Sequence, residues 1–240
     1  MEKKGFRVSV IIPVYNGETF LTQSIESVFH QGYRPYEVIV VDDGSTDGTK
    51  GIVDTFQDGI RYIFQKNRGP AAARNRGLKS ASGDVIAFLD SDDVWPGNKL
   101  EIQVGCLMDN PDVEVLLGGI ELLGAGEVLS SASERIHYGI NLGCALIKRS
   151  AFEKVGCFDE KLTYSEDHDW FLRAKEIGVE MAIKPETTLY YRRHPDSITR
   201  KAGSRNYQLP HILKNSIDRR RNAKHGSTGI LPRLSDLRKL

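Results

Sequence analysis

The chain has 240 residues, of which 40% are hydrophobic and 27% are charged, and its formal net charge is +1 at pH 7. These values are ordinary for a soluble protein with one sizeable core, and we expect no nucleic acid as a partner. No transmembrane helix is expected, because no apolar run reaches about 18 residues.

Strand-like and helix-like segments alternate through the first 90 residues. Apolar runs predict buried strands at 8–15, 36–41 and 60–64, and a fourth strand that ends at Asp90. Helical spacing predicts the intervening helices, at 18–30, after the loop 42–47, and from Pro70 to Ser80. This alternation indicates an α/β fold with a mostly parallel, Rossmann-like central sheet, flanked by helices and joined by right-handed crossovers.

The second half of the chain is less regular. Its predicted helices are 98–108 and 167–177, and its predicted strands are 113–117, 142–148 and 187–193. Residues 119–139 are rich in Gly and Ser and predict a loop or a short hairpin.

The C-terminal tail is basic, and we expect it to be helical at 207–224. Residues 200–240 hold 11 Lys/Arg and 2 Asp/Glu, whereas the rest of the chain holds 22 and 30. A basic tail on an acidic body favours contact with an anionic surface, or else a solvated terminal helix.

The N-terminus and the cysteines bear on the compartment. Met1 to Gly5 lead directly into a strand without the apolar segment of a signal peptide. The three cysteines, Cys106, Cys144 and Cys157, lack metal-binding spacing, so we expect reduced core thiols. A cytoplasmic location is the expectation, with peripheral contact to the inner membrane face as a further possibility through residues 205–240.

Candidate ligand-binding residues follow three predicted strands, whose carboxyl ends meet at one edge of a parallel sheet. Tyr15 can stack on a base, or it can be an ordinary rim aromatic. Asp42 and Asp43 can accept hydrogen bonds from a uracil imide or a ribose hydroxyl, or they can stabilise their own loop.

The most informative group is Asp90-Ser91-Asp92-Asp93, where a buried strand ends in crowded carboxylates. Oxygen ligands of this kind suit Mg²⁺ or Mn²⁺, which usually also bind substrate phosphates. Arg74, on the preceding predicted helix, suits phosphate or carboxylate recognition, or pairing with these aspartates. The sequence thus predicts a cation site that carries a phosphate-containing ligand.

The chain resembles a family 2 glycosyltransferase of the GT-A fold, of the non-processive bacterial type. The matching motifs appear in the family's order over roughly residues 7–200, and together they are specific. They are Ser9-Val-Ile-Ile-Pro-Val-Tyr-Asn16, Val40-Val-Asp-Asp-Gly-Ser-Thr-Asp47, Gly69 with Ala73-Arg-Asn75, Phe88-Leu-Asp-Ser-Asp-Asp93 with Trp95, Phe158-Asp-Glu160, Glu166-Asp167, and Tyr191-Arg-Arg-His194 with Ser197.

The resemblance implies a metal-dependent, inverting hexosyltransferase that moves one sugar from a UDP-sugar to a glycan or lipid-linked acceptor, as in cell-envelope polysaccharide synthesis. It implies Mn²⁺ or Mg²⁺ as cofactor, held by Asp92, Asp90 and His194. The implied donor-binding residues are Pro13, Tyr15, Asp42, Asp43, Arg74, Asp90, Ser91 and Asp92. It also implies a GT-A domain at 1–205, with a nucleotide-sugar half at about 1–97 and an acceptor half at 98–205, followed by the basic tail 206–240.

Asp167 is the implied general base. Glu166, Asp167 and Asp169 also open a predicted helix, where carboxylates are stabilised by the helix dipole alone. We expect crowding by Glu166 and Asp169 to raise the pKa of Asp167. His194 is either a metal ligand or a solvated loop residue, and Arg192 and Arg193 can contact the diphosphate.

Two other functions remain open. Asp90-Ser-Asp92-Asp-Val94 also fits the nucleophile loop of haloacid-dehalogenase-like phosphatases, although that family places the loop after its first strand. A non-catalytic nucleotide-sugar-binding protein is the second alternative. The Gln-x-x-Arg-Trp motif of processive family members does not occur in the sequence, which favours transfer of a single sugar.

Overall fold

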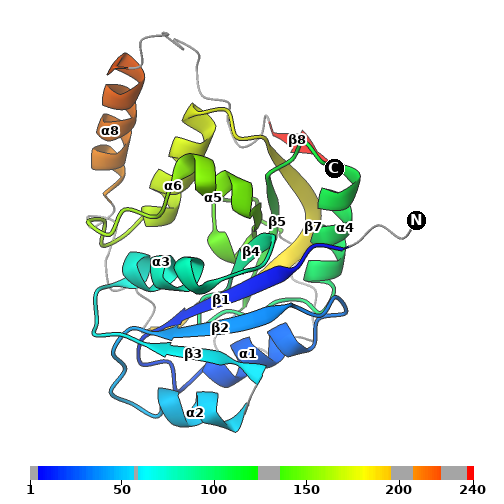
Figure 1. Cartoon of the computed structure of the whole chain (residues 1–240), viewed down its shortest axis with the longest axis vertical. Helices are drawn as coiled ribbons and strands as arrows, with labels where there is room; N and C mark the ends of the chain where they lie inside the picture. Colours follow the sequence, from blue (N-terminus) through cyan, green and yellow to red (C-terminus); the bar gives the residue numbers. More distant parts are fainter. Residues whose placement is uncertain (1–4, 57–58, 124–135, 196–207, 223–236) are drawn as a thin grey trace.

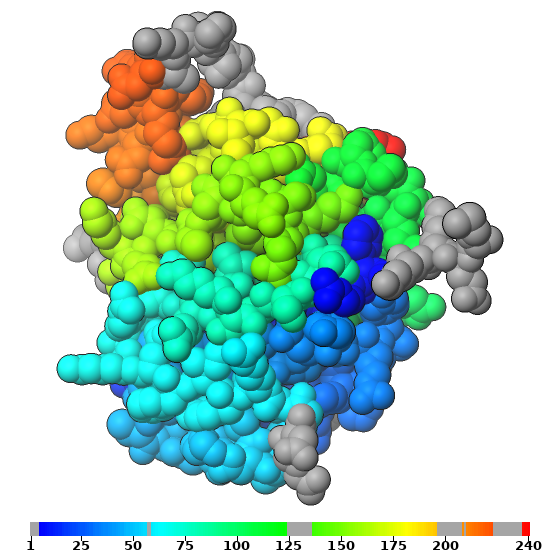
Figure 2. Space-filling model, in the orientation of Figure 1, coloured from blue at the N-terminus to red at the C-terminus, as the bar shows by residue number. Residues whose placement is uncertain are grey.

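An eight-stranded sheet forms the centre of the chain, with the strand order β3-β2-β1-β4-β6-β5-β7-β8. The computed structural model describes residues 5–56, 59–123, 136–195, 208–222 and 237–240. Helix α3 lies on one side of strands β1 to β3, and α1 and α2 lie on the other (Figure 1). Helix α8 stands at the edge of the molecule, next to α6 (Figures 1 and 2).

The first half confirms the predicted alternation. Its elements are β1 (Val8–Val14), α1 (Leu21–Phe29), β2 (Glu37–Asp42), α2 (Thr49–Thr55), β3 (Arg61–Phe64), α3 (Pro70–Ser80) and β4 (Val85–Phe88). All pairings among β1, β2, β3 and β4 are parallel. Every residue of β1 and β4 is buried, as expected for parallel strands covered on both faces.

The second half contains one reversed strand. Its elements are α4 (Lys99–Asp109), β5 (Val115–Leu123), a 3₁₀ turn η2 (Leu142–Cys144), β6 (Leu146–Lys148), α5 (Arg149–Val155), α6 (Glu166–Glu176), β7 (Met181–Arg192), α8 (Leu209–Asn222) and β8 (Arg238–Lys239). Strand β6 is antiparallel to both of its neighbours, β4 and β5. The mostly parallel sheet is therefore confirmed, with β6 as its exception.

Several predicted boundaries were wrong in this half. The single strand expected at 142–148 is a 3₁₀ turn followed by a short strand, because the Asn141 side chain accepts a hydrogen bond from Gly143 N at 2.7 Å. Strand β5 continues to Leu123 because it pairs with β7, so only part of the predicted loop 119–139 remains. Helix α5 and strand β8 had not been predicted. Residues 124–135, Ser197 and the expected boundary at 205–206 lie outside the described residues.

Close packing sets the position of α3 and α6 relative to β4. A Cβ atom at Gly77 would lie 2.4 Å from Ile11 Cγ2, so α3 approaches β1 more closely than any side chain at that position would allow. Phe88 on β4 contacts the ring of Phe158 with centroids 5.5 Å apart, and Phe152 contacts Trp170 of α6 at 4.6 Å. These contacts place the first turn of α6 beside the carboxyl end of β4.

The cysteines fulfil the sequence prediction only in part. All three are free thiols, as expected. Cys144 is buried, but Cys106 is half-buried and Cys157 is exposed, so the description as core residues was wrong for Cys157. Within the described ranges, no helix is long and apolar enough to cross a membrane.

Candidate active site

Three loops meet at the carboxyl edge of the sheet, as predicted. Val14 pairs with Asp42 across β1 and β2, so Tyr15 follows at the level of Asp43. The left-handed Asn16, with φ 51°, ties the two loops together. Its backbone N donates to Ser45 Oγ at 2.9 Å, and its Oδ1 accepts from Thr46 N at 2.8 Å.

Asp42 and Asp43 are buried and already hydrogen-bonded. Asp42 accepts from Ser45 N and from the Tyr62 hydroxyl, both at 2.7 Å. Asp43 accepts from Gln65 Nε2, Arg68 N and Gly69 N at 2.7–2.9 Å. The two carboxylates therefore shape their loops, and a further ligand donor would have to use the remaining lone pairs.

The aromatic side chain of Tyr15 is open to a ligand. It is 52% exposed, whereas Pro13 is buried within β1 and pairs with Val41 of β2. Tyr15 can therefore offer a ring face at the strand end, and Pro13 shapes the backbone beneath it.

Arg74 joins the acidic loop to the first turn of α6. Its guanidinium binds Asp90 Oδ1 at 2.6 Å and forms a second ion pair with Glu166. Burial opposes the charge of Arg74, but the carboxylates of Asp90, Glu166 and Asp167 outweigh it and raise the pKa of Arg74. Of the two possibilities for Arg74, pairing with the aspartate cluster is what the structure displays.

Asp167 is held in the ionised form by its neighbour. Its Oδ1 accepts from His168 N at 2.7 Å and from His168 Nδ1 at 2.8 Å, and Oδ2 accepts no hydrogen bond from the described residues. Burial opposes ionisation, but His168 and Arg74 outweigh it and lower the pKa of Asp167. The predicted rise was wrong, because the hydrogen bonds and charge of the adjacent His168, together with the charge of Arg74, outweigh burial.

Asp92 and His194 lie side by side on the other flank of the acidic loop. His194 Nε2 is 2.9 Å from Asp92 Oδ2, and its ring packs on Phe20 with centroids 4.8 Å apart. Burial and the nearby Asp90 raise the pKa of Asp92, as crowded carboxylates do in the absence of a cation.

The donor set fits a divalent cation that binds few protein ligands. In the described part of the chain, no three His, Cys, Asp or Glu side chains are grouped to hold a metal. Asp90 is turned toward Arg74, which leaves Asp92 and His194 as an adjacent pair. One or two protein ligands are usual for Mg²⁺ when substrate phosphates supply the others, so the pair is sufficient for such a site.

Contacts that the sequence did not reveal fix the acidic loop. Arg192 donates to Asp92 O at 2.9 Å and to Gln23 Oε1 at 2.6 Å. Asp93 is buried, accepts from Arg192 N at 2.8 Å, and leaves Oδ2 without a partner. Ser24 Oγ donates to Ser91 O at 2.8 Å. Arg192 thus supports the loop, whereas Arg193 is exposed.

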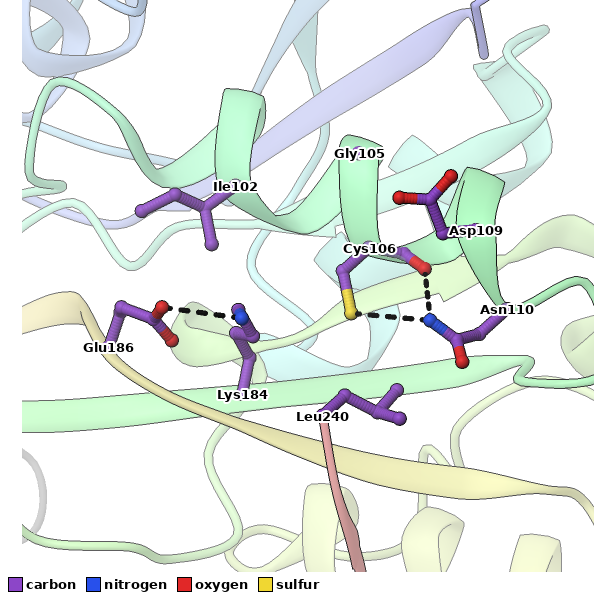
Figure 3. A pocket seen from close by; sticks show the side chains of 8 residues that line it. All are labelled: Ile102, Gly105, Cys106, Asp109, Asn110, Lys184, Glu186 and Leu240. Carbon is purple, nitrogen blue, oxygen red and sulfur yellow. Dashed lines mark hydrogen bonds and ion pairs between the residues drawn. The ribbon is translucent and has the colours of Figure 1, made fainter.

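A separate pocket of about 460 Å³ contains none of the predicted site residues (Figure 3). It lies between α4 and β7, with Leu240 at one side. Lys184 and Glu186 form an ion pair of 3.3 Å within it. The residues of the candidate site therefore lie outside this pocket.

Comparisons with known sequences identify relatives of the chain. Residues 9–122 match the model of the family described as glycosyl transferase family 2. An uncharacterized glycosyltransferase of Rickettsia prowazekii is 37% identical over 183 residues, which are 68% of this chain and 57% of that protein. The Escherichia coli UDP-Glc:alpha-D-GlcNAc-diphosphoundecaprenol beta-1,3-glucosyltransferase WfgD is 37% identical over 151 residues, covering 59% of each protein. The chain thus spans less than two thirds of these curated relatives.

Solved structures share the fold. S. aureus TarS 1-349 in complex with UDP aligns with a TM-score of 0.70 at 22% identity, over 91% of this chain and 66% of that one. The mannosyltransferase PcManGT from Pyrobaculum calidifontis, in complex with GDP-Man and Mn²⁺, aligns with a TM-score of 0.71 at 20% identity, over 98% and 68%. These likenesses confirm the expected GT-A fold.

Proposed function

The chain belongs to glycosyl transferase family 2, and from this premise we propose that it moves one sugar from a UDP-sugar to a hydroxyl of a glycan or lipid-linked acceptor. The observation that carries the proposal is the Arg74 bridge. It places Asp167, next to Glu166, beside the acidic loop at the edge where a nucleotide would bind. A general base and a diphosphate site in one place are what glycosyl transfer requires.

The donor would lie across the ends of β1, β2 and β4. Tyr15 would stack on the base, and Pro13, Asp42 and Asp43 would form the remaining wall of the base and ribose site. UDP as the nucleotide is supported by WfgD, whose name specifies UDP-Glc, and by the TarS complex with UDP.

Asp92 and His194 would hold Mn²⁺ or Mg²⁺, with Asp90 and Ser91 keeping the loop in place. The cation would neutralise the negative charge that develops on the departing diphosphate. A Mn²⁺ complex of a structural neighbour supports this choice of metal.

The reaction would be one inverting displacement. Asp167 Oδ2 would take the proton of the acceptor hydroxyl as that oxygen bonds to the anomeric carbon. The bond from this carbon to the diphosphate would break on the opposite side, and UDP would leave. The lowered pKa of Asp167 keeps the carboxylate in the ionised form that a general base requires at neutral pH, while it also lowers the affinity of that carboxylate for the proton.

A screen of UDP-sugars with Mn²⁺ or Mg²⁺, with UDP release as the readout, tests the function. Slow hydrolysis of one UDP-sugar without acceptor is the expected result. Phosphate release from a generic phosphate ester, without UDP-sugar turnover, would instead support the phosphatase. Tight UDP binding with no turnover of any UDP-sugar would support a non-catalytic binding protein.

Replacing His194 by alanine should weaken metal affinity by at least about tenfold, because one of two protein ligands is lost. Titration of Mn²⁺ in the presence of UDP measures the effect. His211→Ala is the matched control, since His211 is exposed on α8. Identical titration curves for His194→Ala and the wild type would remove His194 from the metal site.

We also propose that α8 contacts an anionic membrane surface, which would bring the enzyme to a lipid-linked acceptor. One face of α8 packs on the body through buried Ile212 and Ser216. Leu213 and Ile217, 48% and 41% exposed, lie one helical turn apart on another face. Exposed Lys214 and Arg221 lie near them, a composition typical of helices at a lipid surface.

The double variant Leu213→Ser/Ile217→Ser should sediment less with anionic vesicles than the wild type does, and neutral vesicles should bind neither protein. Phe64→Ser, which changes a 60% exposed side chain elsewhere, is the control. Equal sedimentation of the double variant and the wild type would exclude α8 as the membrane contact and would leave the transferase proposal intact.

A further inference from the structure

The residue that precedes α6 has an unusual backbone conformation. Ser165, with φ 66° and ψ 24°, lies in the left-handed region, which residues with a Cβ atom adopt only at an energetic cost. Among the described residues other than glycine, only Asn16 shares a positive φ, and asparagine tolerates this region better than serine does. Asn16 directly follows Tyr15. Ser165 is two positions before Asp167, so both unusual residues lie at the candidate site.

The side chain of Ser165 does not compensate for this cost. A serine at the start of a helix usually has an extended backbone and accepts a hydrogen bond from an amide of the first turn. Ser165 makes no such bond, and its hydroxyl is buried without a partner in the described part of the chain. The third amide of α6, that of His168, donates to Asp167 Oδ1 at 2.7 Å instead. Ser165 therefore has a strained backbone and an unpaired hydroxyl, and contacts elsewhere must outweigh both costs.

Contacts with α3 fix the chain on both sides of Ser165. On the N-terminal side, the buried Asn75 binds both backbone groups of Phe158. Asn75 Oδ1 accepts from Phe158 N and Asn75 Nδ2 donates to Phe158 O, each at 2.9 Å. On the C-terminal side, the neighbouring Arg74 pairs with Glu166. Two consecutive residues of one helix thus hold the chain at positions 158 and 166.

Further contacts hold the segment between these two points. Leu162 is buried, and Thr163 N donates to Gln208 Oε1 at 3.1 Å. Ser165 O accepts a hydrogen bond of the first turn of α6 from Asp169 N, also at 3.1 Å. Because both ends and the middle of the segment are held, the turn into α6 falls on its last residue, and the left-handed backbone of Ser165 makes that turn.

We propose that Ser165 is a positioning residue, whose left-handed backbone directs the first turn of α6 so that Asp167 lies beside the acidic loop. This inference rests on the transferase function proposed above. If Ser165 had an extended backbone while Phe158 and Leu162 stayed in place, the first turn would be displaced, and Asp167 with it. A general base must reach the acceptor hydroxyl, and a displacement of about 1 Å is enough to slow a reaction severely. The strain at Ser165 is thus explained by the position that it gives to Asp167.

Ser165→Thr tests the proposal, because threonine keeps the hydroxyl but its branched Cβ disfavours the left-handed region. The kcat of transfer should fall by about tenfold to a hundredfold, as expected when a reacting group is misplaced. UDP affinity, measured by calorimetry, should stay at the wild-type value. Ser80→Thr, at the last residue of α3, makes the same change in a helical conformation and is the matched control, which should alter neither quantity.

Ser165→Gly is the complementary variant, since glycine adopts the left-handed region readily but lacks the hydroxyl. It should transfer sugar at the wild-type rate. Relief of the strain should also raise the urea concentration at the midpoint of unfolding above that of the wild type. This variant keeps the test informative if Ser165→Thr does not fold.

The two variants separate the backbone of Ser165 from its hydroxyl, because the inference predicts that activity follows the backbone preference of the residue. Wild-type transfer by folded Ser165→Thr, or a lower unfolding midpoint of Ser165→Gly, would overturn it. Loss of transfer by Ser165→Gly would also overturn it, and would identify the hydroxyl as the active group. Failure of the transferase proposal looks different, because the wild-type protein itself would then release no UDP from any UDP-sugar.

Discussion

Replacing Asp167 by asparagine should lower sugar transfer by about 10²–10⁴-fold, because the amide cannot accept the proton of the acceptor hydroxyl. UDP affinity should stay nearly unchanged, since the proposed nucleotide site lies at the ends of β1 and β2. Steady-state transfer assays and UDP titration by calorimetry measure the two effects. Wild-type transfer by Asp167→Asn would rule out Asp167 as the base.

Asp169→Asn is the matched control on the same helix. Asp169 pairs with Arg173 at 2.7 Å and with Arg219 at 3.5 Å, on the side of α6 that faces α8. Its replacement should lower the free energy of unfolding while leaving the rate per folded molecule unchanged. If Asp169→Asn loses as much transfer as Asp167→Asn does, the loss comes from a disturbed α6 and does not identify Asp167 as the base.

The pH dependence of transfer follows from the lowered pKa of Asp167. A carboxylate with a lowered pKa in the folded state stays ionised, and contributes stability, until the pH falls through that pKa. The loss of activity caused by protonation of Asp167 should therefore occur below pH 3.8, the ordinary value of an aspartate. His168→Gln removes the main hydrogen-bond donor that stabilises the Asp167 carboxylate. At saturating metal, this variant should therefore lose activity at a higher pH than the wild type does.

Replacing Arg74 by methionine should destabilise the protein by about 3–5 kcal/mol, because the buried Glu166 and the partly exposed Asp90 would lose their shared cation. Transfer should be lost as well, since Asp167 would no longer be held beside the acidic loop. Urea unfolding followed by fluorescence measures the first effect. Arg76→Met, at an exposed position of the same helix, is the control and should change little.

The double variant Arg74→Met/Glu166→Gln separates charge from packing. Neutralising Glu166 removes the unpaired buried carboxylate, so part of the lost stability should return. If the destabilisation of the double variant equals the sum of those of Arg74→Met and Glu166→Gln measured singly, the ion pair is not the reason for the instability. If Arg74→Met has wild-type stability, the bridge has no structural role.

The sequence was most informative where the signal is local. The helix of α3 starts at Pro70 as predicted, because proline fits the first helical turn. The apolar runs that lead to Asp42 and Asp90 also predicted that these carboxylates would lie at one edge of the sheet, although β4 itself already ends at Phe88. Parallel strands have their carboxyl ends at the same edge of a sheet, and this rule alone is enough to place the two groups of carboxylates together.

The features that were missed depend on partners distant in sequence. Strand β8 forms by pairing with the edge strand β7, and the turn before β6 depends on the Asn141 side chain. The lowered pKa of Asp167 depends first on the adjacent His168, whose ring bonds the carboxylate only in the folded chain, and then on Arg74, which is distant in sequence. Nothing near Lys99 in the sequence predicts its complete burial, at 0% exposure.

The close approach of Gly77 to Ile11 affects the position of the Arg74 guanidinium, which Gly77 does not contact. Gly77 lies one turn after Arg74 on α3, and there is no room for a side chain between it and Ile11. Even a methyl group would move the helix outward, and the Arg74 guanidinium with it, away from the carboxylates that it spans. The lack of a Cβ atom at Gly77, on the buried side of α3, thus determines how closely the positive charge of Arg74 approaches Asp90 and Glu166.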